Sequence, residues 1–293
     1  MREGDDDATR HAVIIPSLGR PQVLMETVKN VLRQEPLPDE ILVVITQESD
    51  ASPELKELPK VRVIIGRKGL TLQRNDGIKK LSPEIQYVTF FDDDMELHKH
   101  YLKQIRTFLN AHDEVVLACG KLLANGGLDR NEAKSLVQES EQQPLADSWT
   151  YREWAYGCNM SVRRSVLSST GFDERLRLYA WLEDSDFCMA CKEHGKIAKL
   201  DAAVGVHLMV SSGRVSGVRM GYSQLVNSYY IHKKWKRSMW GCFRGLWMPA
   251  LVANLLKWPF DRQVDRLGRL RGNLQAIWDL ARGKCEPERI EKM

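Results

Sequence analysis

The first third of the chain alternates short apolar runs with helical patterns, and this alternation restricts the fold most strongly. The apolar runs are His11–Pro16, Ile41–Ile45, Val61–Ile65 and Tyr87–Phe91. Ile41–Ile45 is apolar at every position, which is typical of a strand buried on both faces of a parallel sheet. Helical patterns over residues 23–32 and 71–80 separate the runs. Strands alternating with helices predict βαβ units and an α/β fold with a doubly wound, mainly parallel sheet.

The rest of the chain extends this prediction less regularly. Further strands are expected near Val115–Ala118 and up to His207, with a helix over Glu183–His194 between them. In the polar stretch of residues 125–147, the segment Gln138–Pro144 favours a mobile loop over a surface helix. We expect a polar tail over residues 1–10, a catalytic domain over residues 11–220 and a basic, tryptophan-rich helical extension over residues 221–293.

The composition indicates an ordinary globular protein, because 43% of the residues are hydrophobic and 28% are charged. The six cysteines are scattered, which indicates reduced thiols rather than a disulfide framework. Cys188 and Cys191 lack a second pair at metal-binding spacing, so packing is their expected role. The polar start Met1–Asp7 contains no apolar signal region. These features predict a cytoplasmic protein, and no nucleic-acid partner is expected.

Three consecutive carboxylates, Asp92, Asp93 and Asp94, follow the apolar run Tyr87–Phe91. Ligands of open α/β sheets bind beyond the carboxyl ends of the strands, so these side chains are expected at a binding crevice. Strand alternation would turn Asp92 and Asp94 to one side and Asp93 to the other. Carboxylates in this position favour a Mn²⁺ or Mg²⁺ site. The alternative is an acidic turn that caps the next helix.

Glu183 and Asp184 open the predicted helix that contains Cys188 and Cys191. Acidic residues in a first helical turn are favoured by the helix dipole, so helix capping is one interpretation. The other is a general base that removes the proton from an attacking hydroxyl group.

The order of several short motifs resembles glycosyltransferase family 2, the inverting enzymes of the GT-A fold. The resemblance covers about residues 11–210. The motifs are Val13-Ile14-Ile15-Pro16-Ser17 with Arg20, Leu72-Gln73-Arg74-Asn75-Asp76-Gly77, Phe90-Phe91-Asp92-Asp93-Asp94, Gly157-Cys158-Asn159-Met160-Ser161, Gly171-Phe172-Asp173-Glu174 and Glu183-Asp184.

The resemblance implies a role for each of these motifs. It places the donor nucleotide against Pro16, Ser17, Arg20, Gln47, Arg74, Asn75, Asp92 and Asp93. It assigns the metal to Asp94, Asp92 and His207, the base to Asp184 with Glu183 beside it, and the acceptor side to Asn159 and Trp181. For His207 the alternative is a satisfied histidine at the end of a strand.

The segment after the second strand departs from the family pattern. The family commonly has an Asp-Asp-Gly-Ser-like sequence there, whereas this chain has Ile45-Thr46-Gln47-Glu48-Ser49-Asp50. Thr46 or Gln47 remains able to bind a base edge, but the donor base stays open among UDP, dTDP and GDP.

The C-terminal segment Met239–Phe260 is apolar and rich in tryptophan. Between Arg244 and Lys257 lie 12 uncharged residues, fewer than the roughly 20 that a membrane-spanning helix needs. The segment either packs on the catalytic domain or on a second copy of the chain, or it lies in a membrane interface. In the second case the basic residues Lys233, Lys234, Lys236 and Arg237 would meet anionic lipids.

These features together predict a metal-dependent, inverting glycosyltransferase. It would move a sugar from a nucleotide-diphosphate donor to an acceptor hydroxyl on a glycan or a lipid-linked glycan, in cell-surface polysaccharide assembly. It would lie in the cytoplasm or peripherally on the inner face of the membrane. A catalytically silent, sugar-nucleotide-binding scaffold subunit is the alternative. A nucleotidyltransferase would need a triphosphate-binding cluster, which the sequence does not show.

Overall fold

A computed structural model describes residues 9–210, 215–261 and 264–293, which form two compact units. The first unit contains residues 1–68, 73–172 and 187–213, and the second contains residues 69–72, 173–186 and 214–293. Most of the expected N-terminal tail, residues 1–8, lies outside the described residues. The expected boundary at residue 220 differs from this division, because residues 173–186 join the C-terminal helices rather than the sheet.

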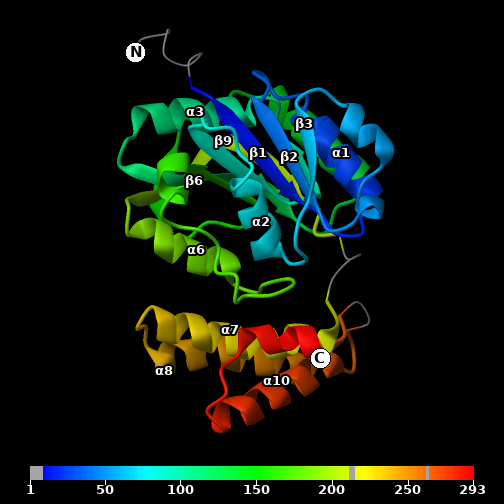
Figure 1. The fold of residues 1–293 in the computed structure, drawn as a ribbon, viewed down its shortest axis with the longest axis vertical. Helices are drawn as coiled ribbons and strands as arrows, with labels where there is room; N and C mark the ends of the chain where they lie inside the picture. The colour runs from blue at the N-terminus through cyan, green and yellow to red at the C-terminus, as the bar shows by residue number, and fades with distance from the viewer. Residues whose placement is uncertain (1–8, 211–214, 262–263) are drawn as a thin grey trace. The chain divides into compact units, whose positions relative to one another are not determined.

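The first unit is built on a nine-stranded sheet with the order β3-β2-β1-β4-β8-β6-β9-β5, in which β7 also pairs with β9. β3, β2, β1 and β4 are parallel, and Figure 1 shows β1, β2 and β3 side by side. The strands are β1 His11–Pro16, β2 Glu40–Ile45, β3 Val61–Ile65, β4 Tyr87–Phe91, β5 Met95–Leu97, β6 Val115–Asn125, β7 Trp149–Arg152, β8 Asn159–Arg163 and β9 Lys196–His207. The predicted α/β fold with a parallel sheet is confirmed.

Helices cover both faces of this sheet. The alternation of β1 divides the core, because Val13 and Ile15 pack with residues of α1 and α3, whereas Ala12 and Ile14 pack with residues of α5 and α6. Cys188 and Cys191 are fully buried in the second of these clusters. The helices are α1 Pro21–Val31, α2 Leu70–Ile78, α3 Tyr101–Ala111, α4 Arg130–Glu141, α5 Arg164–Leu167 and α6 Glu183–Lys192, with short 3₁₀ turns η1 Glu48–Asp50 and η2 Pro53–Glu57.

The expected loop at Gln138–Pro144 is wrong, because α4 extends to Glu141. Asp129 caps this helix by accepting from the backbone N–H groups of Asn131 and Glu132, and the Glu132 side chain accepts from the Asp129 N–H. Ala133 and Val137, four positions apart, are buried on its inner side. A capping box and the apolar contacts of Ala133, Val137 and the partly buried Leu136 therefore hold a helix whose other side chains are polar.

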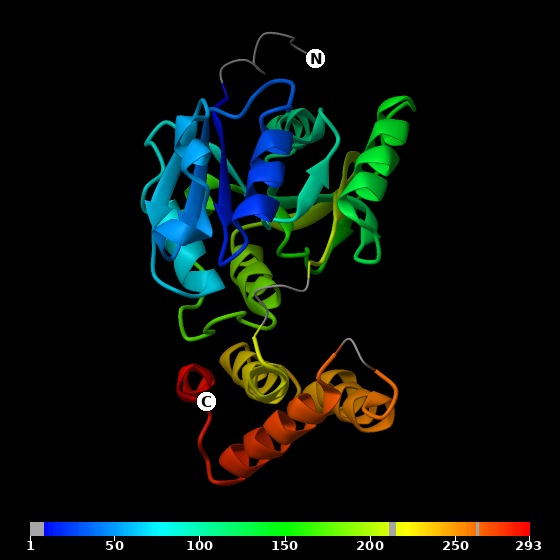
Figure 2. The ribbon, with the colours of Figure 1, turned by 90° about the vertical axis from the view of Figure 1, so that its right-hand side faces the viewer.

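The second unit is helical and contains α7 Gly217–Lys234, α8 Met239–Cys242, the π-helical turn η3 Phe243–Trp247, α9 Met248–Lys257, α10 Arg266–Ala281 and the 3₁₀ turn η4 Pro287–Lys292. α7 (yellow) and α10 (orange-red) cross in Figure 2. They meet at glycines: a Cβ on Gly221 would lie 1.9 Å from the Arg269 carbonyl oxygen, and one on Gly272 would lie 2.0 Å from that of Val218. Among the described helices, none is long and apolar enough to cross a membrane.

Candidate active site

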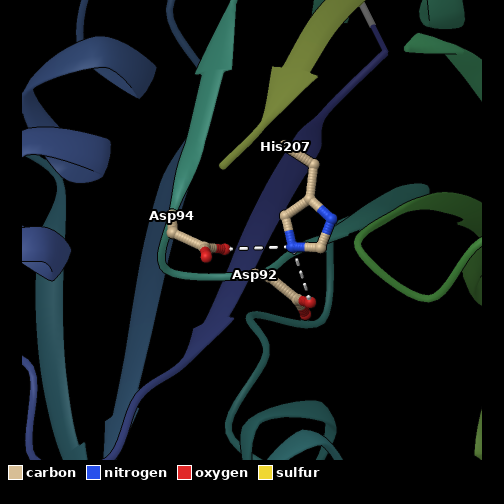
Figure 3. Close-up of side chains that lie close together, drawn as sticks. All are labelled: Asp92, Asp94 and His207. Atoms are coloured by element: carbon tan, nitrogen blue, oxygen red, sulfur yellow. Dashed lines mark ion pairs between the residues drawn. The ribbon is translucent and has the colours of Figure 1, made fainter. Parts of the chain in front are cut away.

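Asp92, Asp94 and His207 converge at one edge of the sheet (Figure 3). The two aspartates follow β4, and His207 is the last residue of β9. The His207 Nε2 atom lies 3.1 Å from Asp94 Oδ1 and 3.6 Å from Asp92 Oδ2. One ligand atom from each residue fits within a span of 4.8 Å. Two carboxylates and an imidazole so close together form a suitable ligand set for Mn²⁺ or a similar divalent cation.

Asn125 orients the His207 ring. Its Oδ1 atom lies 2.8 Å from His207 Nδ1, and the two residues are partners in the β6–β9 register. A proton on Nδ1 directed at Asn125 leaves Nε2 facing the two carboxylates, as is usual for a metal-binding histidine. Burial alone would lower the pKa of His207, but the hydrogen bond to Asp94 and the charges of Asp92 and Asp94 raise it.

The Asp94 carboxylate is fixed by backbone and side-chain contacts. The Val210 N–H donates to Asp94 Oδ2 over 2.7 Å, and Arg20 Nη1 lies 3.9 Å from the same oxygen. Burial would raise the pKa of Asp94, but the hydrogen bond with His207 and the nearby positive charges hold it below its usual value. Asp94 is therefore ionised and held in one orientation.

Asp93 points away from this cluster, as strand alternation predicts. It is fully buried, and its carboxylate accepts from Ser17 Oγ and pairs with Arg20, whose Nη2 lies 2.5 Å from Oδ1. Burial raises the pKa of Asp93 to about 7, against the opposing effects of Arg20 and Ser17. Asp93 thus holds Ser17 and Arg20, and its predicted place against the nucleotide remains a prediction.

Asp92 connects the metal-site candidates to α2. Arg74 is fully buried and donates through Nη2 to Asp92 Oδ1, over 3.1 Å, and to the Gly157 carbonyl, over 2.8 Å. Its guanidinium also lies 5.0 Å from the centre of the Phe172 ring. The Asn75 side chain donates a hydrogen bond to the Phe172 carbonyl and accepts one from the Phe172 N–H. Arg74 and Asn75 thus fix the loops around the site, while their predicted contacts with a nucleotide remain a prediction.

The loops after β1 and β2 are joined through Asp50. Its buried carboxylate accepts from the backbone N–H groups of Gly19, Thr46 and Gln47. Burial would raise the pKa of Asp50, but the hydrogen bonds from Thr46, Gly19 and Gln47 lower it. Pro16 is buried at the end of β1, and Gln47 is exposed beside this junction. Thr46 and Gln47 were both expected to be able to bind the nucleotide base, and Gln47 is the more accessible of the two.

The two predicted acceptor-side residues lie in different units. Asn159 is fully buried in β8 and donates to the Gly120 carbonyl, and its predicted place on the acceptor side remains a prediction. Trp181 is partly exposed in the second unit, where its carbonyl accepts from Asn227.

Glu183 and Asp184 form the first turn of α6, as predicted, and belong to the second unit. Glu183 is buried and Asp184 is partly exposed, with its Oδ1 atom accepting from the Ser185 N–H over 2.7 Å. Their roles remain a prediction.

Sequence reasoning missed four residues that shape the site. These are Asn125 and Val210 at the metal-site candidates, Asp50 in the loop after β2, and Gln73, whose amide bonds the carbonyls of Ser17 and Val44. The spacing of Asp50 after a buried strand is a readable signal for a loop-binding carboxylate. The other three depend on pairing between distant segments and leave no local signal.

Comparison with known proteins finds glycosyltransferases, both by family and by fold. The family model described as Glycosyl transferase family 2 matches residues 12–171. The crystal structure of TarS residues 1–349 from S. aureus is similar, with 15% identity, a TM-score of 0.55, and coverage of 94% of this chain and 73% of that chain. The structure of GalNAc-T7 with UDP, GalNAc and Mn²⁺ has 14% identity and a TM-score of 0.62, covering 99% of this chain and 57% of that one. At such identities the likeness concerns the fold alone. No curated protein sequence matches the chain.

Proposed function

The chain belongs to glycosyl transferase family 2 and is a glycosyltransferase, and on this basis we propose that it is metal-dependent and inverting. It would transfer a sugar from a nucleoside diphosphate donor to an acceptor hydroxyl on a cell-surface glycan or a lipid-linked glycan. The observation that carries the proposal is the convergence of Asp92, Asp94 and His207 beyond the strand ends.

The residues present fit a divalent cation. Asp94 and Asp92 supply hard oxygen ligands, and the contact of His207 Nδ1 with Asn125 turns Nε2 toward them. A bound Mn²⁺ or Mg²⁺ would neutralise charge on the departing diphosphate.

Arg20 supports diphosphate binding at the same place. Its side chain is one-fifth exposed, and its guanidinium is paired with the buried Asp93 and lies 3.9 Å from Asp94. A guanidinium held by a buried carboxylate is pre-oriented and retains donor groups suited to phosphate oxygens. Gln47 would contribute to recognition of the nucleotide base, which leaves the choice of base to experiment.

Asp184 is proposed as the general base. It is partly exposed, and the Ser185 N–H donates to one of its carboxylate oxygens, which leaves the other oxygen to accept a proton. In a single displacement the acceptor oxygen forms a bond to the anomeric carbon while the bond to the diphosphate breaks, and the hydroxyl proton passes to the carboxylate. Because attack occurs opposite the leaving group, the product has inverted configuration.

An Asp184→Asn variant tests this role. Loss of a positioned base typically costs about 10²–10⁴-fold in rate, whereas donor binding should remain. The assay is release of nucleoside diphosphate from a panel of sugar nucleotides with a cell-envelope extract as acceptor source. Glu193→Gln, an exposed carboxylate just after α6, is the matched control. Full turnover by Asp184→Asn would refute the assignment of the base.

We further propose that the second unit binds an anionic membrane surface. Its exposed side chains include Trp240, Leu256, Phe260 and Trp278, and Arg282 lies 4.2 Å over the Trp278 ring. The nearby carboxylates are used internally: Asp261 pairs with Arg266, Asp265 caps α10, and Asp279 accepts from Tyr222. Exposed apolar side chains accompanied by basic residues suit the interface of anionic lipids.

Vesicle co-sedimentation tests the membrane proposal. The protein should bind vesicles that contain phosphatidylglycerol more than vesicles of phosphatidylcholine alone, and Phe260→Ser should weaken this binding. Leu37→Ser, an exposed apolar residue of the first unit, should leave it unchanged. A protein that ignores both vesicles, or that dimerises through this surface in sedimentation experiments, would contradict the proposal.

A further inference from the structure

The segment of residues 173–186, which ends with the Glu183–Asp184 turn, has an unusual backbone. Leu178, Ala180 and Leu182 have positive φ angles of 58°, 55° and 69°. The left-handed conformation is sterically unfavourable for residues other than glycine, so three such residues within five positions require compensating contacts. The contacts come from other parts of the second unit.

The first turn of α2 holds one side of this segment. The Leu70 N–H donates to the Leu178 carbonyl over 2.8 Å, and Thr71 Oγ1 donates to the Leu176 carbonyl over 2.7 Å. All four residues belong to the second unit.

The C-terminal part of α7 holds both ends of the segment. Lys234 Nζ donates to Asp173 Oδ2 and to Asp186 Oδ2, each over 2.8 Å. The indole N–H of Trp235, directly after the helix, donates to the other oxygen of Asp186 over 2.7 Å. One lysine thus connects the first and the last residue of the segment.

Asp186 itself is not suited to act as the base. It is 2% exposed, and both of its oxygens accept hydrogen bonds from α7 and the residue after it. It lies two residues after Asp184 in the same helical turn, so fixing Asp186 also fixes the turn that carries Asp184. In addition, Asn227 of α7 donates to the Trp181 carbonyl over 3.0 Å, just before this turn.

We propose that Lys234 is a positioning residue for catalysis: by bridging Asp173 and Asp186 it holds the strained segment, and with it Asp184, in the reactive orientation. This inference rests on the proposed function of Asp184. It also corrects the expectation that Lys234 meets lipids, because its ammonium group is engaged inside the second unit. The C-terminal helices would therefore have two roles: they position the catalytic base, and they form the surface proposed to bind the membrane.

Lys234→Met is the test, with Lys234→Arg as the conservative variant. The matched control is Lys134→Met, which removes a lysine of similar exposure from an ion pair with the more exposed Glu26 in the first unit. We expect Lys234→Met to lower kcat by about 10–100-fold with the donor KM unchanged, since small misplacements of a reacting group have effects of this size. Lys234→Arg should recover most of the activity, and Lys134→Met should match the wild type.

Hydrogen–deuterium exchange of residues 173–186 gives a second readout that does not depend on activity. Lys234→Met should exchange faster there and not in the β1–β4 strands. Unchanged exchange would refute the bridging role, and faster exchange with unchanged kcat would refute the effect on catalysis. If Lys234→Met does not fold, the Asp186→Asn/Lys234→Met double variant, which removes the lysine together with its buried partner charge and leaves only the Asp173 charge, undergoes the same measurements. A wild-type protein without donor turnover would contradict the proposed function, whereas the exchange result would still decide whether Lys234 holds the segment.

Discussion

Replacement of Gly221 by alanine tests the helix crossing on which the second unit depends. The added Cβ would lie 1.9 Å from the Arg269 carbonyl oxygen, whereas real Cβ contacts essentially never fall below 3.0 Å. α7 and α10 would therefore have to separate by about an ångström, which also loosens the contact at Gly272. Overpacking of this kind costs about 1–3 kcal/mol or more, and the better helix propensity of alanine returns about 1 kcal/mol. We expect a net loss of about 2 kcal/mol, or roughly 4–8 °C in Tm.

Gly245→Ala is the matched control, because Gly245 is also helical and a Cβ there meets no atom within 4 Å. It should leave stability unchanged or raise it by up to about 1 kcal/mol. Calorimetry and urea unfolding of the wild type and both variants provide the comparison. If Gly221→Ala were as stable as the wild type, the close crossing of α7 and α10 would be wrong.

Two further predictions concern the first unit. Burial, together with the charge of Arg106, lowers the pKa of His11 from 6.5 to about 3, so the folded protein keeps it neutral while the unfolded chain takes up a proton below pH 6.5. The free energy of unfolding should therefore fall as the pH is lowered from 6.5 to 3, and this group contributes at most about 1.4 kcal/mol per pH unit. Urea unfolding measured across this pH range should show a shallower fall for His11→Gln than for the wild type. Equal slopes for the two proteins would contradict the prediction. Asp50→Asn weakens the acceptor of three backbone N–H groups and should lower the free energy of unfolding by about 2 kcal/mol. If calorimetry showed unchanged stability, Asp50 would not join the loops after β1 and β2.

The parallel part of the fold could be predicted because burial on both faces leaves a clear trace in sequence. Ile41–Ile45 is apolar throughout, and Asp92–Asp94 follows a similar run. The C-terminal part of the helix at Arg130–Glu141 was missed because its apolar contacts, Ala133, Leu136 and Val137, all lie before Gln138. The Asp129–Glu132 capping box was a readable signal for its start.

Residues of the site could be predicted from the sequence only where they belong to a local motif. Asn125 meets His207 because β6 continues far beyond the predicted strand end and pairs with β9, and no local pattern contains that register. Asn159 was expected at the acceptor because its motif resembles the family pattern, yet its strand is central and its side chain is covered. Burial of a motif residue depends on the final order of the strands.

In the proposed reaction, Asp92, Asp94 and His207 hold a divalent cation that binds the donor diphosphate. The most direct measurement is the Tm of the wild type, Asp94→Asn and the control Asp113→Asn, whose side chain is 99% exposed, with UDP, GDP or dTDP and either Mn²⁺ or EDTA. Ligand at 100 times its Kd stabilises the folded state by about 2.7 kcal/mol. We predict that one diphosphate raises the Tm of the wild type and of Asp113→Asn only with Mn²⁺, and that Asp94→Asn shows no such rise. An equal rise in EDTA, or in Asp94→Asn, would contradict the account.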